Sequence, residues 1–294
     1  MKLLITGGTG FIGYHLAKKA VSKGWKVTSV SSNKPKKKRF LKKVKYIKCN
    51  LSNKKKLKKI LNANFNHVVN LAGYVDHSNK NQTYKSHYLG CVNLANLLIN
   101  KKINSFIQIG SSLEYGKKRS PHNELMKCNP ISIYAKSKYL SSKYLLDLNK
   151  NNNFPAVIFR LYQAYGGKQD NNRLIPITIS NCLRNQQFPC SEGSQKRDFL
   201  FIDDLTRALF LAMSKKRSKG HIFNIGTGRP VKVKHIIKKI QKLIGSGHPK
   251  FGKIKLRSEE SSSSYPNIKK AKNILNWSPK ITLESGLKFT IEDF

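Results

Sequence analysis

Long hydrophobic runs are missing from this sequence, and cysteines are few and scattered. No apolar run approaches the ~20 residues that a transmembrane helix needs. The apolar start of the chain reaches Thr6 before a secretory h-region of about 7 residues could form. The cysteines are Cys49, Cys91, Cys128, Cys182 and Cys190. Their odd number and the lack of C-x-x-C spacing indicate neither a disulfide framework nor a metal site, so we expect a cytoplasmic protein without a membrane span.

Acidic residues are also scarce. The chain has 14 Asp and Glu against 57 Lys and Arg, a formal charge of +43. Such a charge is typical of nucleic-acid binders and of proteins on anionic surfaces. However, lysines occur along almost the whole chain, and Leu57, Ile60 and Leu61 lie at helical spacing with lysines on the outer face. This favours a solvated surface over a nucleic-acid partner. Peripheral contact with anionic surfaces and a nucleic-acid-binding or regulatory role remain open alternatives.

Apolar segments recur in an alternating pattern. Strand-like segments are 2–6, 26–31, 44–48, 67–71, 105–110 and 156–161. Helical patterns lie between and after them at 11–22, 54–62, 83–100, 132–149, 173–184 and 203–214. Strands that alternate with helices predict an α/β fold with a doubly wound parallel sheet. The length of 294 residues is typical of about two domains.

A glycine-rich turn follows the first expected strand and opens the first expected helix. Gly7, Gly10 and Gly13 are spaced three apart in Thr6-Gly7-Gly8-Thr9-Gly10-Phe11-Ile12-Gly13. Such a turn lets a dinucleotide pyrophosphate approach the backbone closely. The expected division is a Rossmann-type NAD(P)-binding domain at 1–165 and a smaller, mainly substrate-binding domain at 166–294, from which about 200–226 returns to the first.

The end of the second expected strand selects between NAD and NADP. An acidic residue there would bind the ribose hydroxyls of NAD. The sequence has Ser31, Ser32, Asn33 and Lys34 instead, followed by further cations as far as Arg39. Small hydroxyls followed by cations suit the 2′-phosphate of NADP(H), which we favour over NAD(H).

Two later strand ends complete the expected cofactor site. Asn50 and Leu51 follow the third strand, where they could contact the adenine edge. Leu71, Ala72 and Gly73 follow the fourth and should run along the cofactor. The residues expected to bind it from the glycine turn are Gly7, Gly10, Phe11, Ile12 and Gly13.

Three residues form a candidate catalytic set. Ser111 lies at the end of the fifth expected strand, and Tyr134 and Lys138 are four apart on one face of the next helix. The pKa of a free tyrosine is near ~10, and a nearby ammonium lowers it. The serine hydroxyl can bind the reacting oxygen. This set predicts acid–base chemistry in which Tyr134 exchanges the proton, with Tyr134 and Lys138 also contacting the cofactor.

These motifs resemble those of the extended short-chain dehydrogenases/reductases, in the NAD-dependent epimerase/dehydratase group that acts on nucleotide sugars. The resemblance covers essentially the whole chain. It implies an NAD(P)-dependent oxidoreductase or epimerase that forms homodimers through the helices near 83–100 and 132–149. It also implies a place in surface polysaccharide or O-antigen sugar synthesis. The substrate-binding residues that it implies are Ser112, Gln163 (where an Asn is usual), Arg173 and Arg197, the last on the substrate pyrophosphate.

Departures from the family pattern narrow the reaction. Dehydratases of the family carry an acidic pair where this chain has Ser112 and Leu113. Glu114 is one position late, and such an offset along a strand points the side chain to the opposite face. We therefore expect NADPH-dependent reduction of the 4-keto group of a nucleotide-linked 4-keto-6-deoxy sugar, or alternatively an NAD-dependent nucleotide-sugar 4-epimerase. His87, where the family usually has Asn, is expected to be a packing residue.

Overall fold

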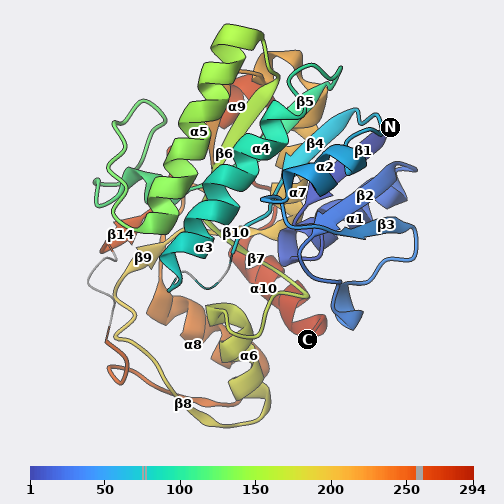
Figure 1. Cartoon of the computed structure of the whole chain (residues 1–294). Helices are drawn as coiled ribbons and strands as arrows, with labels where there is room; N and C mark the ends of the chain where they lie inside the picture. The colour runs from blue at the N-terminus through green and yellow to red at the C-terminus, as the bar shows by residue number, and fades with distance from the viewer. Residues whose placement is uncertain (75, 77, 256–260) are drawn as a thin grey trace.

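The computed structural model describes residues 1–74, 76, 78–255 and 261–294. Its main strands are β1 (Lys2–Thr6), β2 (Lys26–Ser31), β3 (Val44–Lys48), β4 (His67–Asn70), β5 (Ser105–Ser111), β6 (Ala156–Leu161) and β11 (His221–Ile225). Within the described residues these form a seven-stranded sheet in the order β11-β6-β5-β4-β1-β2-β3, with every pair parallel (Figure 1). The strand order reverses between β4 and β1. In doubly wound sheets, ligands bind beside the carboxyl ends of the strands at such a reversal.

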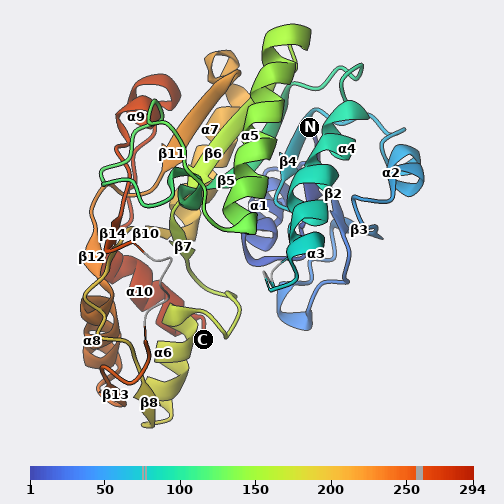
Figure 2. The same cartoon turned by 60° about the vertical axis from the view of Figure 1, so that its left-hand side comes forward.

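Helices cover both faces of the sheet. One face carries α1 (Phe11–Ser22) and α7 (Ile202–Ser214), and the other carries α4 (Gly90–Asn96) and α5 (Ile133–Asn152) (Figures 1 and 2). Strand side chains alternate between the two faces. Leu3 and Ile5 therefore join the core around α1, while Leu4 joins the core around α4 and α5. The predicted α/β fold with a doubly wound parallel sheet is confirmed.

The helix predicted at 83–100 is interrupted in the structure. It is divided into α3 (Lys80–Tyr84), a π-helical turn η2 (Lys85–Leu89) and α4, which ends at Asn96. Within η2, His87 is buried, and a Cβ on Gly73 would lie only 1.9 Å from its ring. π-helical turns are rare and frequent at functional sites. The other helices differ by a few residues, since α5 ends at Asn152 rather than 149 and α2 (Lys54–Ile60) ends before 62.

Residues after β6 build a smaller lobe beside the carboxyl edge of the sheet (Figure 1). Its helices are α6 (Leu174–Leu183), α8 (Val233–Ile244) and α10 (Leu283–Glu292), with α9 (Lys269–Leu275) beside β11. Its short strands are β7 (Gln163–Tyr165), β8 (Gln187–Pro189), β9 (Lys196–Arg197), β10 (Phe199–Phe201), β12 (Val231–Lys232), β13 (His248–Lys250) and β14 (Ser263–Ser264). α7 and β11 return to the main sheet. Among the described residues, the helices are all too short or too polar to cross a bilayer.

Candidate active site

The glycine turn between β1 and α1 is packed too closely for side chains. Gly7 adopts φ +70°, and a Cβ on it would lie 2.8 Å from the carbonyl of Leu71. A Cβ on Gly13 would lie 2.5 Å from the Cα of Gly8. Gly10 is the N-cap of α1, so the N–H groups and the positive dipole end of the first helical turn are open to an anion. The turn fits the pyrophosphate of a dinucleotide.

The basic segment after β2 contacts the loop that leads to α6. Arg39 is only 3% exposed, donates to the Lys168 carbonyl at 2.8 and 2.6 Å, and pairs with Asp170 at 3.0 Å. Lys36 pairs with Asp170 at 3.2 Å, and Lys38 donates to the same loop. The sequence grouped these cations with a site for a 2′-phosphate. In the structure they hold the loop.

The last residue of β2, Ser31, and the three residues after it do not contact this loop in the same way. Ser31 is buried, and its hydroxyl accepts from the Thr9 N–H of the glycine turn at 3.4 Å. Ser32, Asn33 and Lys34 are exposed. Among Ser31, Ser32, Asn33 and Lys34, which were predicted to bind the 2′-phosphate, Lys34 is the cation, and it is exposed just after β2.

The ends of β3 and β4 lie on either side of the glycine turn in the sheet. Leu71 and Ala72 run directly beside Gly7. Leu51 is buried, and the side chain of Asn50 accepts from the backbone N–H two residues later at 3.0 Å, which holds the turn after β3. The remaining predicted cofactor residues, Phe11 and Ile12, open α1 and are half-buried.

The three candidate catalytic residues are brought together. Ser111 ends β5, while Tyr134 and Lys138 lie in the first turns of α5, whose N-cap Ser132 accepts from the Ala135 N–H at 3.2 Å. Ser111 and Tyr134 share a side-chain hydrogen bond. The Lys138 ammonium lies 5.7 Å from the centre of the Tyr134 ring and donates to the Ile109 carbonyl at 2.7 Å.

Burial dominates the titration of this set. It lowers the pKa of Lys138 to about 8, although the Glu114 carboxylate acts to raise it. It also raises the pKa of Tyr134, against the opposing effects of the Ser111 hydrogen bond and the Arg173 cation. We expected the Lys138 ammonium to lower the pKa of Tyr134. A cation, Arg173, does act in that direction, but desolvation is the larger effect. Tyr134 is consequently held protonated, ready to donate.

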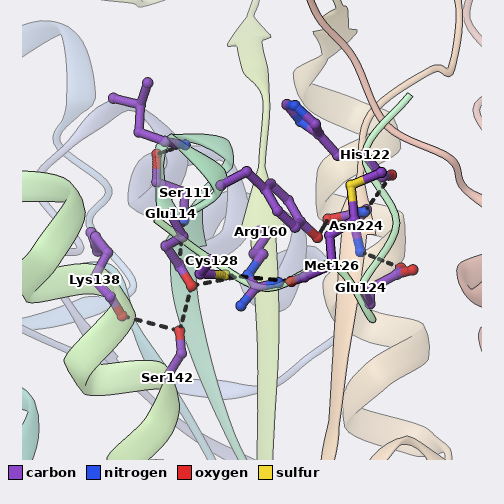
Figure 3. A network of polar contacts seen from close by, with 12 residues as sticks. Ser111, Glu114, His122, Glu124, Met126, Cys128, Lys138, Ser142, Arg160 and Asn224 are labelled. Atoms are coloured by element: carbon purple, nitrogen blue, oxygen red, sulfur yellow. Dashed lines mark hydrogen bonds and ion pairs between the residues drawn. The ribbon is translucent and has the colours of Figure 1, made fainter. Parts of the chain in front are cut away.

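The sequence predicted that Glu114 lies on a strand and points to its opposite face. In the structure, Glu114 does not lie on a strand. Residues Ser112–Tyr115 form a 3₁₀ turn, η3, which rotates the carboxylate back towards the end of β5. Glu114 accepts from the Ser111 N–H at 2.9 Å, and the Ser111 hydroxyl accepts from the Leu113 N–H at 3.2 Å (Figure 3). This is a capping box, and the Ser-x-x-Glu pattern that signals it is present at 111–114. The sequence therefore contained the signal for Glu114, which strand periodicity concealed.

His87 packs as predicted, and its partner is the candidate catalytic residue Tyr134. Its ring meets the Tyr134 ring edge to face, with 4.9 Å between the centres. Its Nε2 lies 3.1 Å from the Tyr74 carbonyl, and the ring also lies against Gly73. His87 thus supports the tyrosine from the side of the segment that follows β4.

The predicted substrate residues are spread over both lobes. Ser112 is buried beside Ser111, whereas Gln163 and Arg173 are exposed on the segments that follow β6. Arg173 is the N-cap of α6, and its charge acts on Tyr134. Arg197 lies on β9 in the smaller lobe and donates to the Ser261 carbonyl at 2.9 Å. Ser112 and Arg173 are therefore the predicted substrate residues that the structure connects to the catalytic set, Ser112 by its place beside Ser111 and Arg173 by its charge.

Asp198, which follows Arg197, has a structural role. Its buried carboxylate accepts from Thr227 N–H at 2.6 Å, from the Thr227 hydroxyl at 2.9 Å and from Gly228 N–H at 2.7 Å. Burial raises the pKa of Asp198 to about 6, against these hydrogen bonds. The Arg-Asp-Phe segment thus fastens the turn after β11 to the smaller lobe.

Comparisons with known proteins agree with this geometry. The family model "NAD dependent epimerase/dehydratase family" matches residues 3–226. A putative UDP-glucose 4-epimerase of Methanocaldococcus jannaschii is 29% identical over 97% of this chain and 96% of its own length. A CDP-abequose synthase of Salmonella muenchen is 26% identical over 98% of this chain and 96% of its own length.

Solved structures give the same result. The UDP-glucose 4-epimerase of Thermotoga maritima, solved with UDP-glucose, superposes with a TM-score of 0.94 and 27% identity, over 100% of this chain and 98% of that one. The UDP-glucuronic acid 4-epimerase of Bacillus cereus, solved with UDP-glucuronic acid and NAD, has a TM-score of 0.91 and 26% identity with the same coverage. This chain belongs to the NAD-dependent epimerase/dehydratase family of extended short-chain dehydrogenases/reductases.

Proposed function

We propose that the protein reduces the 4-keto group of a nucleotide-linked 4-keto-6-deoxy sugar and uses exchangeable NADPH. The observation that carries this proposal is the lack of acidic residues in the part of the chain that would hold the adenosine. The first acidic residue of the sequence is Asp76, after β1, β2, β3 and β4. No carboxylate from these strand ends can therefore bind the ribose hydroxyls of NAD in the usual way.

The chain's own residues suit carbonyl reduction. Tyr134 is held protonated by burial and can donate its phenolic proton to the oxygen of the reacting carbonyl. The Ser111 hydroxyl, hydrogen-bonded to Tyr134, can bind the same oxygen as negative charge develops on it. Lys138 would hold the nicotinamide ribose, and a bound nicotinamide cofactor would supply the hydride. Gly7, Gly10 and the first turn of α1 would hold its pyrophosphate.

Elimination of water is disfavoured by the same site. Dehydration needs a separate acid and base beside the sugar, and the two positions after Ser111 are Ser112 and Leu113. Glu114 is the nearest carboxylate in sequence, but it is fully buried and paired with Arg160 at 2.9 Å. It is turned into the protein and cannot serve as the acid.

The test is cofactor consumption. The purified protein is mixed with NADPH or NADH and a panel of nucleotide-linked 4-keto-6-deoxy sugars, and the absorbance of the reduced cofactor is followed. Oxidation of NADPH with one member of the panel is the expected result and identifies the nucleotide. A protein that oxidises neither cofactor with any member would overturn the proposal.

A second candidate is an NAD-dependent nucleotide-sugar 4-epimerase. It is favoured by the contacts of Lys36, Lys38 and Arg39 with the loop before α6, because cations used there are not free for a 2′-phosphate. It needs the same Ser111, Tyr134 and Lys138. It predicts that NAD leaves the protein only on denaturation and that a UDP-hexose is interconverted at C4 without added cofactor.

We also propose a homodimer in the cytoplasm that serves surface polysaccharide or O-antigen sugar synthesis. The outer surfaces of α4 and α5 lie side by side in both views (Figures 1 and 2). Leu89, at the end of η2, is 37% exposed there, and the hydroxyl of Tyr144 on α5 donates to Asn96. Two adjacent helices that present Leu89 and Tyr144 are suited to packing against their own copy. Light scattering during gel filtration should give twice the 33.4 kDa chain mass.

A further inference from the structure

A fully buried carboxylate lies beside the catalytic set and takes no part in the chemistry proposed above. Glu114 is 0% exposed. Its Oε1 accepts from the Ser111 N–H at 2.9 Å, and its Oε2 accepts from the Ser142 hydroxyl at 3.1 Å and from Arg160 Nε at 2.9 Å (Figure 3). The carboxylate thus holds three donors from three parts of the chain, at the end of β5, in α5 and in β6.

These contacts connect the serine to the helix that carries the tyrosine and lysine. Ser142 lies one turn after Lys138 in α5 and also donates to the Lys138 carbonyl at 3.0 Å. Space for the carboxylate exists because residue 110 is glycine. A Cβ on Gly110 would lie 2.4 Å from Glu114 Oε1. The local sequence is therefore fitted to this buried group.

The charge of Glu114 is paired with one buried cation, Arg160. Arg160 is 3% exposed, and its guanidinium lies 4.6 Å from the centre of the Tyr115 ring. Its Nη1 is buried without a hydrogen-bond partner among the described residues, so the ion pair with Glu114 is its main compensation. A buried cation that loses its partner is costly. The pair with Glu114 therefore compensates the buried charge of Arg160.

Lys138 is faced by few titratable groups. Burial lowers its pKa to about 8, and the groups that act in the opposite direction are Glu114 and then Cys91. Burial raises the pKa of Cys91 to about 12, so this thiol is neutral at physiological pH. Tyr134, the neighbour on the same helix face, is also neutral. Glu114 is thus the negative charge that acts on the Lys138 ammonium.

We propose that Glu114 is a positioning residue of the active site. Its hydrogen bonds to the Ser111 N–H and the Ser142 hydroxyl fix the end of β5 against α5 and place its carboxylate at Ser142, one helical turn from Lys138. This inference rests on the proposed role of Ser111, Tyr134 and Lys138 in hydride-transfer chemistry. Glu114 acts through these residues and does not touch the substrate.

The first experiment measures Lys138 itself. Lysine labelled with ¹³C at Cε is titrated by NMR, and the Lys138 signal is assigned by its loss in Lys138→Arg. In Glu114→Gln the pKa of Lys138 should fall by about 1 unit or more, since an opposite charge has been removed. Glu124→Gln is the matched control, because Glu124 accepts from the Asn224 N–H at 2.8 Å and is not among the groups that act on Lys138. An unchanged titration in Glu114→Gln would overturn the proposal.

Activity is the second readout. In Glu114→Gln we expect kcat to fall about 10-fold or more with KM nearly unchanged, because a small displacement of Ser111 affects the reaction more than binding. The alkaline limb of the pH profile should move to lower pH, as Lys138 loses its proton earlier. A purely structural role would lower the amount of active enzyme without moving this limb. If the wild-type protein lacks the proposed activity, the NMR titration still decides the role of Glu114.

A double variant guards against misfolding. Glu114→Gln leaves Arg160 as a buried, unpaired cation, which could unfold the protein. Glu114→Gln/Arg160→Met removes both charges of the pair. The folded double variant lacks the carboxylate that fixes the Ser111 N–H, so its kcat should fall as in Glu114→Gln. A folded double variant with wild-type kcat would contradict the inference.

Discussion

At the scale of single residues, the active site is defined by which groups are desolvated. Burial raises the pKa of Tyr134 and lowers the pKa of Lys138, so it favours the neutral form of both side chains. A tyrosine that keeps its proton is suited to donate it to a developing alkoxide, and a lysine with a pKa of about 8 depends on a nearby carboxylate to remain charged at neutral pH.

Tyr134→Phe tests the acid. Turnover should fall by about 10²–10⁴-fold, since the phenylalanine ring keeps the packing against His87 but has no proton to give. Cofactor binding, measured by fluorescence, should be retained. Tyr139→Phe, on the same helix, should leave turnover unchanged, and near-normal turnover in Tyr134→Phe would exclude Tyr134 as the acid.

His67 gives a pH dependence of stability. It is buried at the start of β4, stacks on Trp25 and lies 2.8 Å from the Ser105 hydroxyl. Burial lowers its pKa to about 4, below the ordinary value of 6.5. Between these values the unfolded chain binds a proton that the folded protein does not, so stability contributed here is complete above pH 6.5 and is lost as the pH falls towards 4.

The measurement is a comparison of thermal midpoints. The difference in Tm between the wild type and His67→Gln should be largest above pH 6.5 and should shrink towards pH 4. The variant His235→Gln, at an exposed position on α8, is the control for the loss of a histidine. A constant difference for His67→Gln would show that its titration does not contribute.

At the scale of elements, the sequence predicted what depends on local periodicity. Strands β1 to β6 of the main sheet and most of the predicted helices were found within a few residues of their predicted bounds, because apolar spacing alone fixes which face is buried. Strand β11 of the same sheet was not predicted as a strand. The π-helical turn η2 was not predicted, since it depends on His87 fitting against Gly73. The position of Glu114 was predicted wrongly for a similar reason, because η3 ends the strand periodicity at Ser111.

The contacts between the basic segment after β2 and the loop before α6 could not be predicted either. They join residues separated by more than 120 positions, such as Arg39 and Lys168. Charge runs have no local partner in the sequence, and their role depends on which distant loop the fold brings near. The structure shows that this loop also receives contacts from His15 and Asp293.

Asp170→Asn tests this connection. Loss of the ion pairs with Arg39 and Lys36 should loosen the loop, and trypsin should cleave after Lys168 several-fold faster than in the wild type. Because the Arg39 guanidinium holds the pKa of Asp170 below its ordinary value of 3.8, this contribution is present above that pH and is lost as the pH falls further. Glu284→Gln removes an exposed pair with Lys239 and should not alter cleavage after Lys168. Equal cleavage in Asp170→Asn and the wild type would show that the pairs do not restrain the loop.

At the scale of the whole molecule, self-repulsion is the main electrostatic effect. A charge of +43 on 294 residues leaves most cations without an acidic partner. Dissolved salt screens such repulsion over about 8–10 Å at physiological strength. We therefore expect the thermal midpoint to rise as sodium chloride increases from roughly 0.05 to 0.5 M.

The control is sucrose at matched osmolality, which stabilises by exclusion and not by screening. A rise specific to salt is the expected outcome. A midpoint that falls with salt would mean that the few ion pairs, such as those of Asp170, outweigh the repulsion among the lysines.

The space beside Gly110 has an evolutionary consequence. Any side chain at this position would occupy the volume that the Glu114 carboxylate fills. A change at one position therefore requires a change at the other. Among related chains, a glycine at the position of Gly110 should co-vary with a carboxylate at the position of Glu114 and with an arginine at the position of Arg160. Chains that carry all three residues would form a branch of the family that shares this buried ion pair.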